Sequence, residues 1–383
     1  MDKIPFNKTH VTGNELKYIA EVISSGKISG DGAFTKRCQR FLENRYGFRK
    51  CLLTTSCTDA LEMAAILFNI RPGDEVIVPS YTFVSTANAF VLRGAKIMFA
   101  DSETNTPNIA AKEIEALISP RTKAIVVVHY GGIACEMDEI MAIAQKYNLF
   151  VLEDAAQAID AYYKGRPLGS IGHLSAFSFH ETKNIISGEG GMLAINDERF
   201  LERAEIIRDK GTNRGKFSRG EVDKYEWTDV GSSYLPSELV AAFLYAQLEK
   251  IEVIQACRQN VWAQYYKGLQ PLSDKGFFRC ILTGNEKTQN ANTFCIVTKS
   301  ELERSCLIDL LKEHGVIAAF HYLSLHKSPF FVNQHGNRDL PNADKYSTRL
   351  LRLPFFAEMS SEEVNEVIRL VVYFYTKDSQ NHS

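Results

Sequence analysis

Basic residues are not in excess in this sequence, which carries 44 Lys and Arg against 46 Asp and Glu, a formal net charge of −2. A dedicated nucleic-acid-binding protein normally has a basic excess. Long apolar runs are also missing: none approaches the roughly 18 to 20 residues of a membrane-spanning helix, and the N-terminus lacks the features of a signal peptide. We therefore expect a soluble, cytoplasmic protein without nucleic-acid binding or membrane insertion, in which local groups meet any anionic ligand.

Cysteines at metal-ligand spacing are absent too. The eight cysteines are scattered without a CxxC, so we expect reduced thiols rather than a disulfide frame or a zinc site, and we predict no metal site. Cys57 alone stands near a candidate site, where we interpret it as a small buried side chain and not as a nucleophile. The 383 residues, 45% of them hydrophobic and 23% charged, suit two domains, or one large domain with a smaller one attached.

Short apolar runs alternate with helical segments in the first part of the chain. This alternation predicts an α/β fold with a mostly parallel sheet covered on both faces. Because ligands of such sheets lie beyond the carboxyl ends of the strands, we expect Ser56, Tyr81, His129, Asp154 and Lys183 to converge on one pocket. The predicted strands are 51–54, 75–78, 96–100, 124–128 and 150–152, and the helices between them 58–68, 84–92, 111–117 and 138–147.

Helices are also predicted on both sides of this alternating region. Two precede it, at 13–25 and 35–46, and a long one at 237–266 bridges to a smaller C-terminal domain. The predicted domains are 1–250 and 251–383. Within the second, we expect a strand at 293–297, a helix opened by the capping pair Ser300 and Glu303, a strand at 316–320 and a last helix at 361–375.

One lysine has a distinctive setting. Lys183 follows a strand-like run that ends at Phe179, and the glycine cluster 188–191 leads to a second apolar run at 192–195. A lysine in such a turn is usually a solvated surface residue. Here, however, another apolar strand leads directly to Asp154. A pyridoxal phosphate site requires a carboxylate beside the pyridinium nitrogen and a lysine that holds the cofactor covalently, so this pair predicts such a site.

Two turns fit the remaining parts of this cofactor. A hydroxyl-rich turn at 54–58 opens a predicted helix, and hydroxyls with free backbone N–H groups at a helix N-terminus bind phosphate, although an ordinary N-cap is equally consistent. After the strand 75–78, an aromatic side chain can lie against a flat ring. We choose Phe83 for this role and Tyr81 as the second candidate, with core packing as the alternative for each.

A basic segment lies at 208–224. It contains six basic and three acidic residues, a local net charge of +3. One interpretation is a solvated surface loop, and the other is an arm that binds the negative charge of a sugar diphosphate.

Several long motifs together resemble one family. The chain is similar over nearly its whole length to the nucleotide-sugar aminotransferases of the DegT/DnrJ/EryC1/StrS family. The stretches that carry the resemblance are 56–61 (SCTDAL), 153–157 (EDAAQ), 177–184 (FSFHETKN) and 188–191 (GEGG), with 4–6 (IPF) near the start and 320–322 (FHY) and His326 near the end.

The resemblance implies an aspartate aminotransferase-like fold, fold type I, with pyridoxal phosphate as cofactor and Lys183 and Asp154 as catalytic residues. It places Gln157 near the ring hydroxyl, and Thr58, the Asp59 backbone and Ser178 at the phosphate. The cofactor-binding residues implied are Ser56, Cys57, Thr58, Asp59, Phe83, Asp154, Gln157, Ser178, Lys183 and Asn184. The candidate substrate-binding residues are Tyr81, Lys210, Asn213, Arg214, Tyr225, His321, Tyr322 and His326.

The same resemblance implies L-glutamate as amino donor, a nucleotide-linked keto sugar as acceptor, and a homodimer. In relatives, an asparagine or arginine of the neighbouring subunit often completes the phosphate site, but the matching position here is Leu235, so Asn184 and Asn213 are alternative candidates. Some members of the fold have histidine in place of the lysine and catalyse dehydration, whereas here the position is Lys183 and His180 lies three residues before it. A 3-aminotransferase, a dehydratase and a catalytically silent protein of the same fold remain alternatives.

Overall fold

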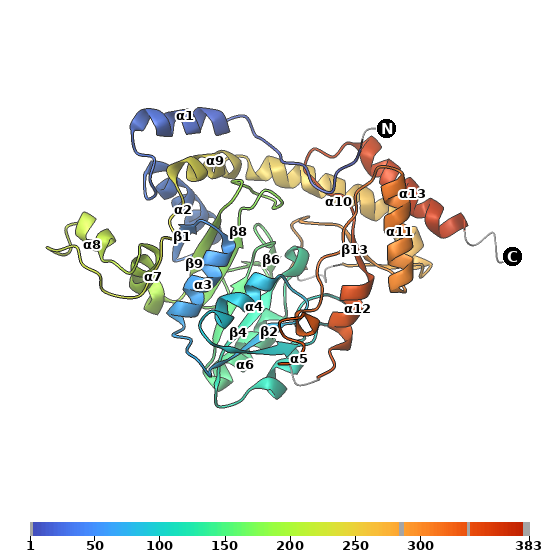
Figure 1. The fold of residues 1–383 in the computed structure, drawn as a ribbon. Helices are drawn as coiled ribbons and strands as arrows, with labels where there is room; N and C mark the ends of the chain where they lie inside the picture. Colours follow the sequence, from blue (N-terminus) through green and yellow to red (C-terminus); the bar gives the residue numbers. More distant parts are fainter. Residues whose placement is uncertain (1–2, 283–286, 335–337, 378–383) are drawn as a thin grey trace.

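The computed structural model describes residues 3–282, 287–334 and 338–377. Its centre is a seven-stranded sheet (Figure 1), in which β9 alone runs against the other strands. This confirms the predicted α/β fold with a mostly parallel sheet. In spatial order the strands are β1 (Lys50–Thr54), β9 (Gly191–Ile195), β8 (Leu174–Ser178), β5 (Phe150–Asp154), β4 (Thr122–Val128), β2 (Glu75–Pro79) and β3 (Lys96–Ala100).

Both faces of the sheet are buried under helices. Successive residues of each strand point to opposite faces, so each strand contributes side chains to two apolar clusters. On β4, for example, Ile125 and Val127 join one apolar cluster and Val126 joins the other. One face packs on α2 (Ala33–Tyr46), α5 (Ala111–Ile114), α6 (Met137–Tyr147) and α9 (Glu238–Leu248), with α1 (Glu15–Ser25) outside them. The other face packs on α3 (Cys57–Leu67), α4 (Val84–Val91) and α7 (Leu201–Arg208).

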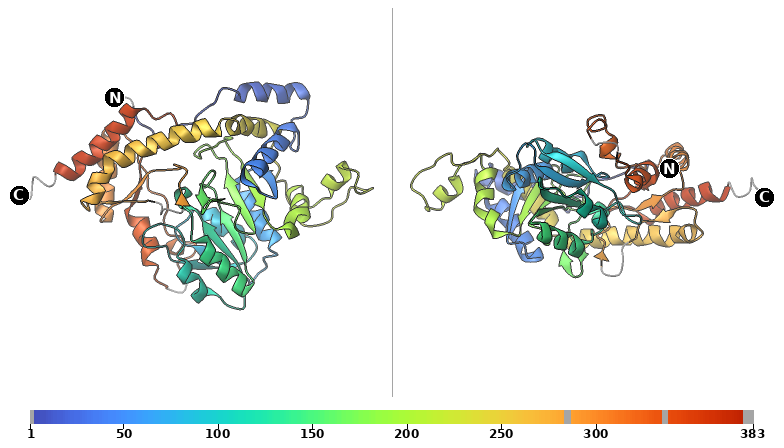
Figure 2. Two further views of the ribbon diagram at one scale, coloured as in Figure 1. Left: turned by 180° about the vertical axis from the view of Figure 1, so that it is seen from behind. Right: turned by 90° about the horizontal axis from the view of Figure 1, so that it is seen from below.

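The C-terminal part builds a third apolar cluster, which lies to one side of the large sheet in both views of Figure 2. A small antiparallel sheet runs β10 (Arg279–Cys280), β12 (Cys295–Val297), β13 (Leu350–Arg352). The helices around it are α10 (Ile251–Asp274), α11 (Glu301–Glu313), α12 (Pro341–Arg349) and α13 (Ser361–Lys377).

The remaining elements are short. A minor sheet joins β11 (Lys287–Thr288), β6 (Tyr162–Tyr163) and β7 (Arg166–Pro167), and α8 (Arg214–Ser218) projects from the body of the molecule in Figure 1. Turns of 3₁₀ helix lie at Glu115–Leu117, Tyr130–Gly132, Glu198–Phe200 and Leu325–Lys327. None of the helices in the described part of the chain is both long and apolar enough to span a bilayer.

Two predicted elements differ from the structure. The single helix expected at 237–266 is two helices, since α9 ends at Leu248 and α10 begins at Ile251. The strand expected at 316–320 forms only two isolated bridges, from Val316 to Ile4 and from Ala319 to Arg352. The domain boundary between residues 250 and 251 falls at the junction of α9 and α10 and stays a prediction.

Candidate active site

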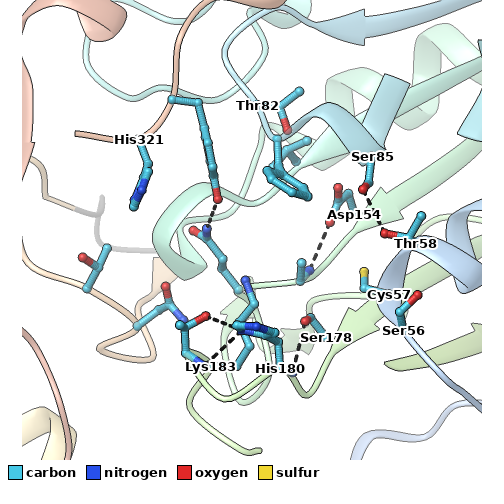
Figure 3. A pocket seen from close by; sticks show the side chains of 18 of the residues that line it. Ser56, Cys57, Thr58, Thr82, Ser85, Asp154, Ser178, His180, Lys183 and His321 are labelled. Carbon is cyan, nitrogen blue, oxygen red and sulfur yellow. Dashed lines mark hydrogen bonds between the residues drawn. The ribbon is translucent and has the colours of Figure 1, made fainter. Parts of the chain in front are cut away.

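A cavity of about 520 Å³ opens at the carboxyl edge of the large sheet. Loops that follow β1, β2, β5 and β8 form one wall, and residues of the C-terminal part, among them His321, Tyr322 and Arg352, form the other. Figure 3 shows Lys183 and Asp154 pointing into this space. The predicted site residues that line it are Ser56, Cys57, Thr58, Phe83, Asp154, Gln157, Ser178, Lys183, His321 and Tyr322.

Asp154 is the last residue of β5, and its buried carboxylate has two hydrogen-bond donors. The Thr86 hydroxyl donates to Oδ2 at 2.7 Å, and the backbone N–H of Ala156 donates to Oδ1 at 3.2 Å. Burial raises the pKa of this carboxyl group, although both hydrogen bonds and the charge of Lys183 oppose the rise. A buried carboxylate with only neutral hydrogen-bond donors is stabilised by a ligand that brings a positively charged N–H group.

Lys183 lies in the loop between β8 and β9, and its amine has a lowered pKa. Burial is the main cause and the positive charge of Arg352 adds to it, while Cys57 and Asp154 act in the opposite direction. A lowered pKa increases the neutral fraction of the amine, which is the form required of a nucleophile or a general base. The cavity therefore holds a group that accepts a proton and one that stabilises positive charge.

Hydroxyl groups gather at the N-terminus of α3. Ser56 is the N-cap and accepts a hydrogen bond from the Asp59 backbone N–H at 3.1 Å, while Thr58 donates to the Ser85 hydroxyl at 2.8 Å. The first backbone N–H groups of a helix have no acceptor within it. Hydroxyls, free N–H groups and the positive end of the helix dipole together suit a phosphate.

The backbone of β9 passes very close to the start of α3, at Gly191. A Cβ on Gly191 would lie 2.3 Å from the Ser56 carbonyl carbon and 2.4 Å from the Cys57 nitrogen. Real Cβ atoms do not approach backbone that closely, so a glycine is required where β9 passes the start of α3. The glycine cluster thus fits the loop of Lys183 against the hydroxyl turn.

Phe83 and Tyr322 form an aromatic part of the wall, with ring centroids 5.8 Å apart. The Tyr322 hydroxyl accepts a hydrogen bond at 3.2 Å from Nε2 of Gln157, whose Oε1 accepts one at 2.6 Å from the Gly131 backbone. Phe83 is 52% exposed, whereas Tyr81 is 1% exposed. Of the two aromatic candidates, the structure leaves only Phe83 with a face open to a ligand.

The structure turns several predicted residues away from the cavity, where other groups satisfy them. The Asn184 amide donates to Gln255 at 2.9 Å and to the Asn290 carbonyl at 2.7 Å. The buried Tyr81 hydroxyl donates to the His321 carbonyl. The Asp59 carboxylate accepts from the Thr55 hydroxyl, whereas its backbone N–H, the group predicted to bind phosphate, donates to the Ser56 hydroxyl. His326 is buried beside the Ser80 hydroxyl at 2.7 Å, and His129 is buried against Glu153 at 2.9 Å.

The four candidates near the basic segment also lie outside this cavity. They belong to the region around α8, which extends away from it in Figure 1. Asn213 is buried and donates to the Lys224 carbonyl at 3.0 Å. Lys210 and Arg214 both pair with Asp209, at 2.9 Å and 3.6 Å, and Tyr225 is exposed.

Carboxylates from outside the basic segment reduce its charge. Arg208 pairs with Asp31 at 2.7 Å, Lys216 with Glu202 at 2.5 Å, and Arg219 with Glu205 at 3.1 Å as well as with Glu221. These three pairs neutralise part of the charge counted along the sequence. Glu205 also pairs with Lys50, and Lys27 and Lys36 line the same hollow as Arg208 and Arg214, so basic residues from outside the segment lie beside it too.

Some cavity residues were missed by the sequence reasoning. Ser85 lies two residues after Phe83, near the start of the predicted helix 84–92, and its hydroxyl marks it as a phosphate candidate. Arg352 reaches the cavity because β13 pairs with β12, a contact between segments far apart in the chain. Further residues on the wall are Phe6, Asn7, Leu61, Thr82, Val128, Ala156, His180, Thr182, Glu189, Gly190, Asn292, Thr293 and Phe355.

Comparison with known proteins places this geometry in a family. The model of the DegT/DnrJ/EryC1/StrS aminotransferase family matches residues 10–372. The chain belongs to this family. It is 34% identical to the spore coat polysaccharide biosynthesis protein SpsC of Bacillus subtilis, over 96% of both chains.

Solved aminotransferases have the same fold. The aminotransferase from Psychrobacter cryohalolentis superposes with a TM-score of 0.91 at 26% identity, covering 97% of this chain and 99% of its own. TlmJ from Streptoalloteichus hindustanus superposes with a TM-score of 0.89 at 27% identity, over 98% and 99% of the two chains. The predicted fold type I is thus confirmed, and the chain is a sugar aminotransferase that depends on pyridoxal phosphate.

The DegT/DnrJ/EryC1/StrS family cofactor fits the groups in the cavity. A flat ring with a phosphate at one end and a nitrogen at the other requires the donor set found here: Lys183, Asp154, the exposed face of Phe83, and the hydroxyls of Ser56, Thr58, Ser85 and Ser178. When bound, pyridoxal phosphate supplies an electron sink for the bond broken at the substrate carbon. The assignment of these residues to its phosphate, ring and nitrogen is a proposal.

Proposed function

We propose that this protein transfers an amino group from L-glutamate to the C4 keto carbon of dTDP-4-dehydro-6-deoxy-D-glucose. The products are dTDP-4-amino-4,6-dideoxy-D-galactose and 2-oxoglutarate. This is the reaction of the dTDP-4-dehydro-6-deoxyglucose 4-aminotransferase of enterobacterial common antigen synthesis. Its support is the likeness of two stretches to that enzyme, 79–93 and 210–235, the second of which includes 212–214 (TNR) and 222–225 (VDKY).

In this proposal the residues of the cavity divide the proton chemistry between them. Asp154 would keep the ring nitrogen of the cofactor protonated. To do so the buried carboxylate must be ionised, and the positive charge of the protonated nitrogen beside it favours that form. Lys183, once released from the cofactor, carries a proton to and from the substrate carbon as a neutral amine. Phe83 and Tyr322 limit the access of water to the reacting atoms.

We also propose that the protein acts as a homodimer in the cytoplasm. The segment that carries Lys210, Asn213, Arg214 and Tyr225 projects away from the cavity of its own chain (Figure 1). These residues are able to bind substrate only in the cavity of a second copy. In such a dimer, the residues near α8 of one copy would lie beside the cavity of the other copy, with no change in the fold of either chain.

NMR of the product tests the substrate and the position of amination together. The holoenzyme is incubated with L-glutamate and dTDP-4-dehydro-6-deoxy-D-glucose, and in parallel with the 3-keto isomer. Nitrogen at C4 with galactose stereochemistry is the expected result. Amination of the 3-keto isomer alone indicates a 3-aminotransferase, loss of a hydroxyl without incorporation of nitrogen indicates a dehydratase, and either outcome contradicts the proposal. Lys183→Ala is the blank.

A further inference from the structure

Arg352 is a cation in the cavity wall whose side-chain hydrogen-bonding partners and facing aromatic ring are all neutral. Nε donates to the Thr293 hydroxyl at 3.1 Å, and Nη1 lies 3.3 Å from Nδ1 of His321. The guanidinium also lies over the Phe6 ring, 5.3 Å from its centroid. None of these neighbours carries a negative charge, so the protein around Arg352 solvates the cation without neutralising it.

The guanidinium therefore has capacity left for a ligand. Among the residues that the structure describes, no carboxylate forms an ion pair with Arg352 and no protein acceptor is bonded to its Nη2. Charged groups taken out of water are normally paired. A guanidinium with free N–H groups on its outer edge binds a carboxylate through two parallel hydrogen bonds. The unmet charge faces the same space as Lys183 and Asp154.

His321 supports this arrangement as a neutral donor. Burial, together with the charges of Arg352 and Lys183, lowers its pKa to about 4. A neutral ring whose Nδ1 accepts from Arg352 carries its proton on Nε2. In Figure 3, His321 points into the cavity at the end away from Ser56 and Thr58. The cavity thus has a hydroxyl-lined end and, opposite to it, an end lined by Arg352 and His321.

Two anions enter the proposed reaction, and their geometry distinguishes them. The α-carboxylate of an amino donor is one bond from the carbon that reacts beside Lys183. The diphosphate of a nucleotide sugar is separated from the keto carbon by the hexose ring. Arg352 lines the same cavity as Lys183, and its charge contributes to the lowered pKa of that amine. The position of Arg352 matches the nearer anion.

We propose that Arg352, with His321 beside it, binds the α-carboxylate of the amino donor. This inference rests on the proposed amino transfer but not on the identity of the sugar. When the keto sugar replaces the donor, neutral sugar oxygens accept hydrogen bonds from the same guanidinium. Arg352 therefore contributes much more to the binding of the donor than to that of the sugar.

Binding of a donor that cannot complete the transfer measures this contribution without turnover. α-Methyl-L-glutamate lacks the Cα hydrogen and is titrated calorimetrically into the holoenzyme. We expect Arg352→Gln to raise its Kd roughly 10- to 100-fold, since hydrogen bonds between charged groups are removed. Arg352→Lys keeps the charge but not the fork and should raise the Kd less. Arg349→Gln, an equal change of charge outside the cavity wall, should leave the Kd unaltered.

The first half of the reaction separates the possible roles of Arg352. Conversion of the cofactor is followed by absorbance with L-glutamate and with L-glutamine, both of which have an α-carboxylate. Arg352→Gln should weaken both donors by the same factor. A loss confined to L-glutamate assigns Arg352 to the side-chain carboxylate, a loss confined to the nucleotide sugar assigns it to the diphosphate, and no loss leaves it without a role in binding. Each of these three results overturns the proposal.

Two further controls keep the outcomes distinct. If Arg352→Gln does not fold, as judged by its thermal melting, Arg352→Lys decides the question through the same titrations. A wild-type protein that converts L-glutamate but does not aminate the dTDP-linked sugar disproves the proposed substrate and leaves the assignment of Arg352 intact.

Discussion

Two consecutive carboxylates at the end of β5, Glu153 and Asp154, point to opposite faces of the sheet and differ in their surroundings. Glu153 faces away from the cavity. His129 lies 2.9 Å from its Oε2, and backbone N–H groups of a single loop donate to both of its oxygens. Burial raises the pKa of Glu153, but these hydrogen bonds and His129 outweigh it, so the pKa is lowered overall. The loop donors are Gly169 at 2.7 Å, Ile171 at 2.8 Å and Gly172 at 2.5 Å.

Asp154 is buried as well, yet its pKa is raised. It has two donors where Glu153 has four hydrogen-bonding partners, and it faces the cavity. The protein thus satisfies one carboxylate completely and leaves the other in need of a cation. Burial alone does not distinguish a structural acid from a functional one, but the number of its donors does.

Among the residues that face the cavity, substitution of Lys183 should reduce activity the most. Lys183→Ala removes the amine that attacks and carries protons, and we expect transamination to fall by about 10³-fold or more. After borohydride reduction, mass spectrometry should detect the cofactor on the peptide that contains Lys183 in the wild type only. Retention of a covalently bound cofactor by the variant would show that another amine holds it.

Asp154→Asn should be the next in size. It removes a buried charge aimed at the reacting group, and we expect a loss of activity of about 10²- to 10³-fold. Because the pKa of Asp154 is raised in the folded chain, its ionised form costs stability, so the cofactor-free variant should unfold at the same denaturant concentration as the wild type or a higher one. If Asp154→Asn were clearly less stable than the wild type, Asp154 would have a structural role like that of Glu153, and the contrast between the two carboxylates would be wrong.

Glu153→Gln should have the reverse profile. It breaks a buried charge network and leaves donors unpaired, and we expect it to lower the free energy of unfolding by about 3 kcal/mol. The variant that still folds should keep activity closer to wild type than Asp154→Asn. Chemical denaturation and initial rates measured on both variants give the two quantities. Unchanged stability together with abolished turnover would contradict the structural role of Glu153.

The smallest expected effect concerns the pH dependence of stability at His321. Its pKa is about 4 in the folded chain against an ordinary 6.5, so between these values the unfolded chain binds more protons. The contribution of His321 to stability is present above about pH 6.5 and is lost as the pH falls toward 4. Denaturation of the cofactor-free protein at pH 7 and pH 5 should show a smaller decrease for His321→Gln. The exposed His314→Gln should keep the wild-type decrease, and an equal decrease in all three proteins would contradict the prediction.

The sequence was sufficient for the sheet and for much of the cavity, because alternating strands and helices leave few possible topologies and bring strand ends to one edge. It did not distinguish neighbours whose side chains alternate across a strand or turn. Val128 lines the cavity while His129 is buried behind it, and Phe83 is open while Tyr81 is enclosed. One step of register decides the first case. Tyr81 and Phe83 lie two residues apart in one turn, where contacts with the C-terminal part enclose Tyr81, whose hydroxyl donates to the His321 carbonyl. Composition encodes neither effect.

Contacts between distant segments account for the other differences. Asn184 adjoins the catalytic lysine but turns toward Gln255 and Asn290, whose positions depend on the packing of α10. Arg352 is an ordinary arginine in the sequence and enters the cavity only through the strand pairing of the C-terminal part. Local pattern carries no information about such partners, so these placements required the folded chain.

The division of the cavity wall between two parts of the chain also bears on how the site is assembled. The groups proposed to hold the cofactor all lie before residue 196, on or beside the large sheet, whereas His321 and Arg352 follow more than a hundred residues later. Segments of a chain fold largely in their order of synthesis. Competence to bind the cofactor should therefore precede competence to recognise the amino donor during biosynthesis.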